Sequence, residues 1–162
     1  MRIAEGILSF HIVSPGLWSA DWEWGLPLIV LTVVVHVLGL GLINRKTARV
    51  FSHLKQHRHP TAAFAVVMGT TTLLVTILHA VEAGIWAGSY KFLGALTDSK
   101  VAILYSLSAM TSYGHANVIL ENQWQLLGAI EALNGWLLFG LTTAFLFGML
   151  EKIWSSSDIG GY

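Results

Sequence analysis

Several ionisable side chains lie inside long apolar stretches of this sequence, where such groups are costly and usually mark function. His79 and Glu82 are three residues apart, so a helix would place them on one face. His36 lies in an earlier apolar stretch, at a depth similar to that of His79 if the two stretches form antiparallel helices. These three groups could form a proton-linked switch, a metal site, or a hydrogen-bonded set that steadies helix packing.

The two histidines also allow a different chemistry. Neutral imidazoles of His36 and His79, at matched depth on neighbouring helices, could ligate a haem iron axially, as in membrane b-type cytochromes. Cysteine is absent, which excludes disulfides, thiolate metal sites and cysteine nucleophiles. The sequence has no phosphate-binding loop, hydrolase serine or carboxylate dyad, so we expect no enzyme activity.

A second polar set lies in the last apolar stretch. Glu131 and Asn134 are again three residues apart, and Gly135 and Thr142 follow. Gly135 could be the bending point of a pore-lining helix, with Asn134 or Thr142 facing an aqueous cavity. A small residue such as Gly135 also allows close helix approach. We expect Glu131 to lie within protein and to brace a neighbouring loop, residues 111–117, through hydrogen bonds.

Composition defines the elements that must position these groups. Of 162 residues, 54% are hydrophobic and only 11% are charged, which is typical of an integral membrane protein. With roughly 20 apolar residues needed per span, the chain has room for three helical spans, predicted at 26–43, 62–87 and 123–150. Pro27 would fall in the first turn of the first span, where proline is tolerated. The fold is therefore predicted to be all-α, with lipid as a partner and no nucleic acid.

The regions outside the spans predict the orientation. Residues 1–25 contain closely spaced tryptophans, a pattern of interfacial anchoring. The segment 44–60 holds five of the nine Lys and Arg residues, so it is predicted to be cytoplasmic. The N-terminus then lies outside, and the C-terminus, with a flexible tail at 154–162, is cytoplasmic.

The segment between the second and third spans is too apolar for a solvated loop and too short and broken for another span. Asp98 can cap a helix over 99–110, which at 1.5 Å per residue covers roughly 18 Å, about half the hydrocarbon thickness. Irregular backbone after such a helix must line a cavity enclosed by protein or water. We therefore predict a re-entrant helix followed by a loop, with the negative end of the helix dipole favouring a cation.

The residues of this loop carry a family resemblance. Residues 110–118, MTSYGHANV, resemble the potassium-channel signature LTTVGYGDI without a gap. The segment 79–96, HAVEAGIWAGSYKFLGAL, resembles the outer-helix end of small bacterial channels of the two-transmembrane-pore superfamily. The segment 126–150, LLGAIEALNGWLLFGLTTAFLFGML, is similar to their inner helix. The resemblance covers about residues 26–153 and implies a channel-like domain with a pore helix at 99–110.

The resemblance implies a selectivity filter in the loop, made by residues Thr111, Ser112, Tyr113, Gly114, His115, Ala116 and Asn117. Potassium or sodium ions would bind the backbone carbonyls of the first four of these residues, and no other cofactor is implied. Because one loop supplies only a quarter of a coordinating ring, the chain would assemble as a homotetramer. It would lie in a bacterial inner membrane, and other subunits could join it.

Three positions depart from the family pattern. Ala116 stands at the second glycine of the signature, where a side chain at positive φ costs about 1–2 kcal/mol per site. His115 replaces the tyrosine, and Asn117 removes a ring of negative charge at the outer mouth. These departures predict a pore that is less selective for potassium, pH-sensitive through His115, or closed. The alternative function is a non-conducting channel-fold subunit or scaffold in a larger membrane assembly.

Overall fold

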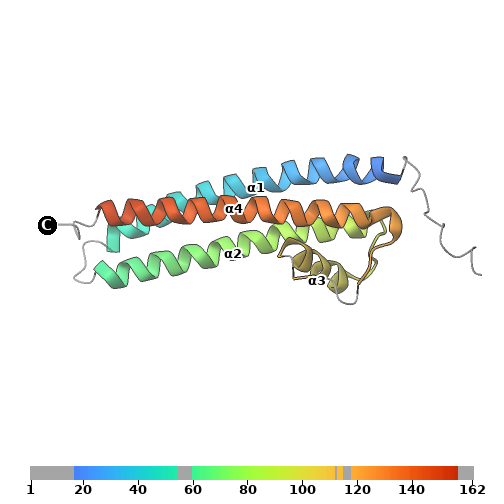
Figure 1. Ribbon diagram of the computed structural model, residues 1–162. Helices are drawn as coiled ribbons and strands as arrows, with labels where there is room; N and C mark the ends of the chain where they lie inside the picture. Colours follow the sequence, from blue (N-terminus) through green and yellow to red (C-terminus); the bar gives the residue numbers. More distant parts are fainter. Residues whose placement is uncertain (1–16, 55–59, 112, 115–117, 157–162) are drawn as a thin grey trace, which may run out of the picture.

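The computed structural model describes residues 17–54, 60–111, 113–114 and 118–156, and the regular structure within these ranges is helical. Three long helices, α1 (Leu17–Leu54), α2 (Pro60–Phe92) and α4 (Gln125–Ser156), form an elongated bundle, and a short helix, α3 (Ser99–Met110), lies beside one end of it (Figure 1). A 3-10 turn, η1 (Asn122–Trp124), leads into α4.

Each long helix contains a segment that is long and apolar enough to cross a membrane, namely Ser19–Val50, Ala62–Phe92 and Gln125–Lys152. The helices α1 and α4 run in one direction along the bundle, and α2 runs in the opposite direction (Figure 1). The expected all-helical architecture with three potential spans is therefore confirmed at this level.

The helices continue beyond the spans predicted at 26–43, 62–87 and 123–150. Hydropathy marks only the part of a helix with apolar side chains, whereas the backbone hydrogen bonds continue through residues such as Arg45 and Lys46, which are good helix formers. Residues 17–25 of the predicted interfacial segment therefore form the first turns of α1. Residues 154–156 of the predicted tail form the end of α4. Residues 1–16 and 157–162 lie outside the described part of the chain.

Pro27 lies inside α1 and not in its first turn, because the helix begins as early as Leu17. A proline inside a helix removes one backbone donor, here the one that would bond the Glu23 carbonyl. Both Pro27 and Glu23 are exposed on the helix surface. The missing bond therefore lies on the outer side of α1, near one end of the bundle.

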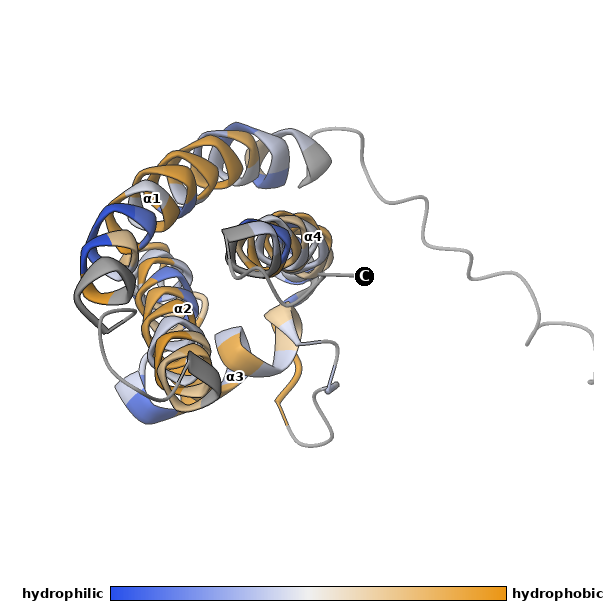
Figure 2. Ribbon diagram, turned by 90° about the vertical axis from the view of Figure 1, so that its left-hand side faces the viewer, coloured by the Kyte–Doolittle hydropathy of each residue, from blue (hydrophilic) through white to orange (hydrophobic). Residues whose placement is uncertain are grey.

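The short helix α3 spans the range predicted from the sequence. Asp98 is its N-cap, and its carboxylate accepts hydrogen bonds from the backbone N–H groups of Lys100 and Val101 at 2.8 and 2.9 Å. An end-on view shows α1, α2 and α4 around the bundle and α3 next to α2 and α4 (Figure 2). The helix α3 therefore packs against α2 and α4.

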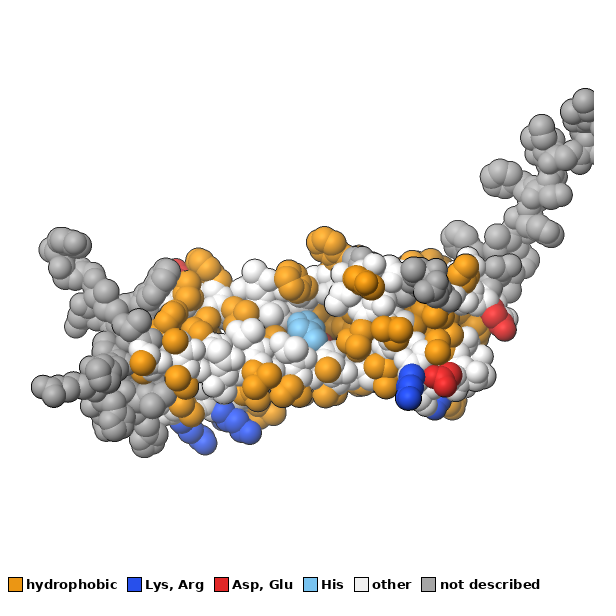
Figure 3. Space-filling view, turned by 90° about the horizontal axis from the view of Figure 1, so that it is seen from below, with side chains coloured by type: hydrophobic (Ala, Val, Ile, Leu, Met, Phe, Trp, Pro, Cys, Tyr) orange, Lys and Arg blue, Asp and Glu red, His pale blue; other side chains and the backbone are white. Residues whose placement is uncertain are grey.

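The bundle has an apolar exterior and a partly polar interior. Large apolar side chains such as Val30, Leu38 and Phe139 are more than 60% exposed, whereas His36, Glu82 and other polar side chains are fully buried. A space-filling view shows apolar side chains over much of one face, with Lys and Arg near the ends and a histidine at mid-length (Figure 3). Lipid contact on the outside and polar pairing inside account for this distribution.

Candidate functional site

Four side chains from three helices meet midway along the bundle, and we call them the His–Glu cluster: His36 from α1, His79 and Glu82 from α2, and Thr142 from α4. His36 Nδ1 lies 2.8 Å from Glu82 Oε1, and His79 Nδ1 lies 3.2 Å from Glu82 Oε2. Thr142 Oγ1 lies 3.2 Å from His36 Nε2 and 3.0 Å from His79 Nε2. The expected proximity of His36, His79 and Glu82 is confirmed, and Thr142 closes them into a ring.

The members of the His–Glu cluster differ in exposure. His36 and Glu82 are completely buried, whereas the His79 side chain is 27% exposed. Glu82 Oε2 is buried without a hydrogen-bond partner, because its approach to His79 has the distance of an ion pair but not the geometry of a hydrogen bond. One atom of the ring is therefore incompletely satisfied, and one member of the ring can be reached from outside.

A second buried carboxyl group lies toward the end of the bundle that carries α3. Glu131 on α4 accepts a hydrogen bond from the Tyr90 hydroxyl on α2 at 2.6 Å and is bonded to Ser106 Oγ on α3. Ser106 Oγ is also 2.8 Å from the backbone carbonyl of Ala83. We call Glu131, Tyr90 and Ser106 the Glu131 cluster. It joins α2, α3 and α4, so Glu131 braces the short helix itself.

The hydroxyl of Ser106 has a single hydrogen but two neighbouring acceptor groups, the Ala83 carbonyl and Glu131 Oε1. A carbonyl cannot donate, so Ser106 must donate to Ala83. The second bond is then satisfied only if Glu131 carries a proton and donates it to Ser106. This hydrogen count favours a neutral Glu131 that makes one acceptor bond and one donor bond.

The buried face of α4 makes two further polar contacts with α1. Asn134 donates to Thr32 Oγ1 at 2.8 Å, and the backbone N–H of Leu127 donates to the Asp21 carboxylate at 3.1 Å. The second contact satisfies a free N–H in the first turn of α4 and places a carboxylate at the positive end of its dipole. It also fixes the start of α4 against α1.

In the single chain, Asn134 and Thr142 line no cavity that the structure describes, and their cavity-facing role stays a prediction. Both side chains are buried in contacts with α1 or α2, because the stripe that contains Glu131, Asn134 and Thr142 turns toward the interior of the bundle. Gly135, one residue further around the helix, does lie at a cavity. Hydropathy alone could not find this rotation, since α4 is apolar on all sides.

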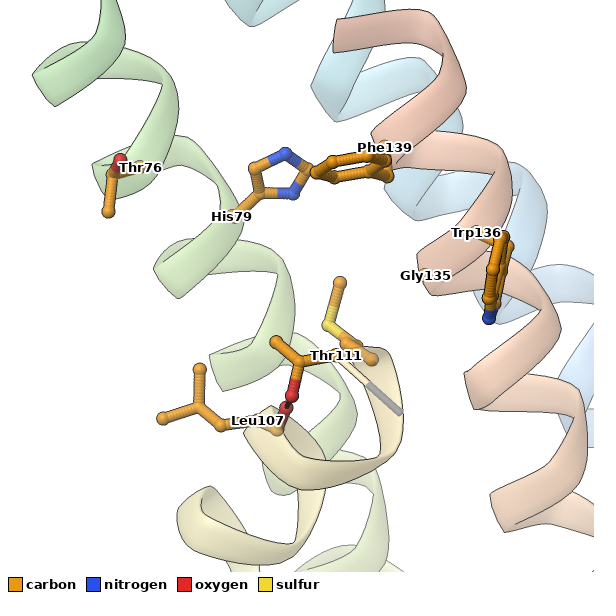
Figure 4. A pocket seen from close by; sticks show the side chains of 8 residues that line it. Thr76, His79, Leu107, Thr111, Gly135, Trp136 and Phe139 are labelled. Carbon is orange, nitrogen blue, oxygen red and sulfur yellow. Dashed lines mark hydrogen bonds between the residues drawn. The ribbon is translucent and has the colours of Figure 1, made fainter. Parts of the chain in front are cut away.

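The cavity has a volume of about 410 Å³ and lies between α2, the C-terminal end of α3 and α4 (Figure 4). Its lining residues are Thr76, His79, Leu107, Met110, Thr111, Gly135, Trp136 and Phe139. The cavity is mostly apolar and connects two predicted sites, because it contains both His79 of the His–Glu cluster and Thr111 of the predicted filter loop. Figure 4 shows His79 and Phe139 approaching each other across it.

At Gly135, the backbone of α4 lies directly against the end of α3. A Cβ atom at this position would lie 2.7 Å from the Cα of Met110, too close for any side chain. The helix α4 is continuous through Gly135, so the contact accounts for glycine there without a bend. A bend at Gly135 stays a prediction, and it would also move the end of α3.

The structure describes part of the predicted filter loop. Thr111 ends α3 and donates from Oγ1 to the Leu107 carbonyl at 2.7 Å, while Tyr113 donates its backbone N–H to the Ser108 carbonyl at 3.1 Å. Gly114 has φ +88°, a conformation that favours glycine. The other predicted filter residues, Ser112, His115, Ala116 and Asn117, lie outside the described residues.

A haem between His36 and His79 does not fit this arrangement. The two ring centroids are 5.1 Å apart, and Glu82 bridges one side of the pair while Thr142 bridges the other. A macrocycle between the rings would have to displace both of these partners. A single metal ion needs far less room: one ligand atom from each of His36, His79 and Glu82 lie within 4.8 Å of one another.

Several residues of the site are not predicted by the sequence, although one of them has a detectable signal. Tyr90 lies on the same helix face as Glu82, two turns later, which is a detectable i, i+8 relation. Ser106 and Thr32 are ordinary small polar residues whose partners become visible only in three dimensions. No protein-family model, no curated protein and no solved structure matches this chain.

Proposed function

We propose that this chain is the subunit of a homotetrameric pore-loop cation channel. The observation that carries the proposal is the position of α3 between the end of α2 and Gly135 of α4. The start of α3 lies against the end of α2, where Lys91 Nζ and Ser99 Oγ are 2.5 Å apart. The end of α3 touches α4 at Gly135, and the chain then returns to η1 at the start of α4.

The position of α3 is compatible with the depth of a pore helix, provided that α4 enters the membrane near its first residue. Gly135 is ten residues into α4, which begins at Gln125, so the end of α3 lies about 15 Å along α4 at 1.5 Å per residue. That distance is about half of a hydrocarbon layer of about 30 Å. The C-terminal end of α3, which carries a partial negative charge, would then point toward the membrane centre and favour a cation there.

The loop after α3 offers further support. Gly114 stands at the first glycine of the potassium-channel signature that the loop resembles, and its positive φ is the conformation for which a filter uses glycine. Backbone carbonyls of Thr111, Ser112, Tyr113 and Gly114 from four copies would coordinate potassium or sodium. With Ala116 at the second glycine, we expect weak discrimination between the two ions.

The charge distribution supports a membrane orientation. Arg45, Lys46 and Arg49 lie near the C-terminal end of α1, whereas Lys91 and Lys100 lie at the opposite end of the bundle, beside α3. The excess of Lys and Arg in 44–60 supports a cytoplasmic location of that end under the positive-inside rule. We therefore propose an inner-membrane protein with its filter loop facing the outside.

Ion flux into liposomes tests the proposal. The purified chain is first shown to be a tetramer by its mass in detergent and is then reconstituted, and uptake of potassium, sodium and caesium is measured at pH 5.5 and 7.5. We expect cation uptake with little preference for potassium over sodium. A verified tetramer without flux at either pH would remove the channel proposal.

Ala116→Gly probes the loop more directly. It introduces glycine at the position that corresponds to the second glycine of the signature, so we expect the potassium-to-sodium flux ratio to rise. The matched control is Ala144→Gly, the same change at an exposed position on α4 away from the loop, which should leave the ratio unchanged. An unchanged ratio in Ala116→Gly would contradict the role given to residue 116.

The second candidate keeps the fold without conduction, as a subunit or scaffold of a larger membrane assembly. It is favoured by Ala116 and His115, which depart from the signature at the centre of the filter. The flux experiment separates the two candidates, since a non-conducting subunit would be stable in the membrane and would pass no ion in any of the variants.

A further inference from the structure

We propose that His36, His79 and Glu82 bind one divalent transition-metal ion of the Zn²⁺ class between α1 and α2. One ligand atom from each residue lies within 4.8 Å of the others. Two imidazoles and one carboxylate are a donor set used by zinc sites that keep a fourth position open. The absence of competing thiolates and the borderline softness of imidazole favour zinc, cobalt or nickel over calcium or magnesium.

The His–Glu cluster has room for a cation on its Glu82 side. Its three hydrogen bonds use the three hydrogens that two neutral histidines and the Thr142 hydroxyl supply. His79 Nδ1 and Glu82 Oε2, 3.2 Å apart, then face each other without a hydrogen between them. The ring is complete only if it takes up one more proton or if a cation replaces the hydrogens on the Glu82 side.

A metal ion would give the two Nδ1 atoms and the Glu82 carboxylate a common partner. With the ion on the two Nδ1 atoms, both Nε2–H groups could donate to Thr142 Oγ1, whose two lone pairs accept them. Metal-bound histidines usually anchor their second ring nitrogen in this way. Thr142 therefore has the position of an orienting partner for both ligands.

The unpartnered carboxylate oxygen is the independent sign of a ligand. Glu82 is completely buried, and its Oε2 has no hydrogen-bond partner although it faces His79 Nδ1 at 3.2 Å. Buried polar atoms are rarely left in this state. An ion between Oε2 and the two Nδ1 atoms would supply the missing partner.

The 410 Å³ cavity gives the ion a way in. His79 is the ligand that lines it, and the remaining lining residues carry no ionised group. The open fourth coordination position would face this space, where a water molecule could complete the shell. The binding site is thus reached from the side of α3 and α4, and its existence does not depend on ion conduction.

Cobalt absorption tests the site in the full-length protein. The background variant replaces His11, His53, His57, His59 and His115 by Gln, so that His36 and His79 are the remaining histidines. Purified background protein in detergent, first treated with a chelator, is titrated with Co²⁺ and then with Zn²⁺. We expect one ion per chain, visible bands of four-coordinate cobalt, and displacement of cobalt by zinc.

Substitutions in this background assign the ligands. His79→Gln and Glu82→Gln should abolish the cobalt bands, and Thr142→Val, which removes only the orienting hydroxyl, should weaken binding about 10–100-fold. Glu131→Gln is the control, because it changes a buried carboxyl group outside the site in the same way. Cobalt bands that persist in His79→Gln, or a folded background protein that binds no ion, would overturn the proposal.

X-ray absorption of the zinc-loaded background protein gives a decision even where a variant does not fold. Two imidazole ligands with oxygen neighbours would identify the site, because two histidines remain in that chain. Fewer than two imidazoles around the zinc would overturn it and indicate binding to surface carboxylates.

Discussion

Glu131 and Glu82 are both completely buried carboxyl groups within the same bundle, but their partners differ in kind. Glu131 is held by hydroxyl groups, Tyr90 on one oxygen and Ser106 on the other, and each bond can be satisfied when the carboxyl group is neutral. Glu82 is held by two histidines, which can carry charge, and one of its oxygens has no hydrogen-bond partner.

The difference separates a structural brace from a site that can change state. The partners of Glu131 do not titrate near neutral pH. Together with Glu131 they join α2, α3 and α4. The partners of Glu82 are imidazoles, which under our proposal bind a metal ion, and His79 opens onto a cavity. Burial of a carboxyl group is therefore insufficient to assign it a function, and the chemistry of its partners decides.

The largest predicted effect on stability comes from replacing Glu82 by Gln, with the same substitution at Glu131 for comparison. Glu82→Gln removes the ion-pair partner of a buried histidine and should lower the free energy of unfolding by about 3–5 kcal/mol. Glu131→Gln keeps one acceptor for Tyr90 and one donor for Ser106, so a change below about 1 kcal/mol is expected. Thermal unfolding in detergent with a chelator present measures both, and equal shifts would erase the distinction between the two groups.

The next largest effect is expected at Gly135, where backbone contact also stabilises the packing of α3 against α4. Gly135→Ala would push its Cβ against the Met110 backbone and should destabilise the protein by about 1–3 kcal/mol. Gly140→Ala on the same helix is the matched control, since its Cβ would have nothing within 4 Å. Unfolding temperatures that fall equally in the two variants would show that α3 does not depend on this contact.

Removing one donor from Glu131 should have a smaller effect. Tyr90→Phe deletes the hydroxyl that bonds Glu131 Oε2 and keeps the ring, so a loss of about 1 kcal/mol is expected. Tyr113→Phe serves as the control, because Tyr113 is 88% exposed. If both variants unfold at the temperature of the unmodified chain, the Tyr90 bond contributes nothing to the brace.

The smallest effect lies between the two clusters, at the contact of Asn134 with Thr32. Thr32→Val removes the acceptor for Asn134 and should cost about 0.6 kcal/mol, the average for hydrogen bonds between membrane helices. Thr143→Val is the reference, since the Thr143 hydroxyl is exposed and bonds its own helix at Phe139. A shift as large as that of Glu82→Gln would mean that polar contacts along α4 act as one coupled network.

Local signals predicted the parts of the fold that depend on neighbouring residues in the chain. Asp98 supplies an N-cap, so the start of α3 could be placed from the sequence, and its end at Met110 was also predicted. The matched depth of His36 and His79 followed from counting residues along antiparallel helices. The ends of α1 were missed, because helical backbone bonds continue where apolar side chains stop.

The sequence by itself determined that this is an all-helical chain with three potential membrane spans and a short helix before the last one. Only the tertiary structure decided which way each polar residue turns. It directed Asn134 and Thr142 toward α1 and α2, left Gly135 against Met110, and gave Glu82 and Glu131 their different partners. The physical reason is that helices apolar on all sides carry no sequence record of their rotation, so packing against neighbours fixes it.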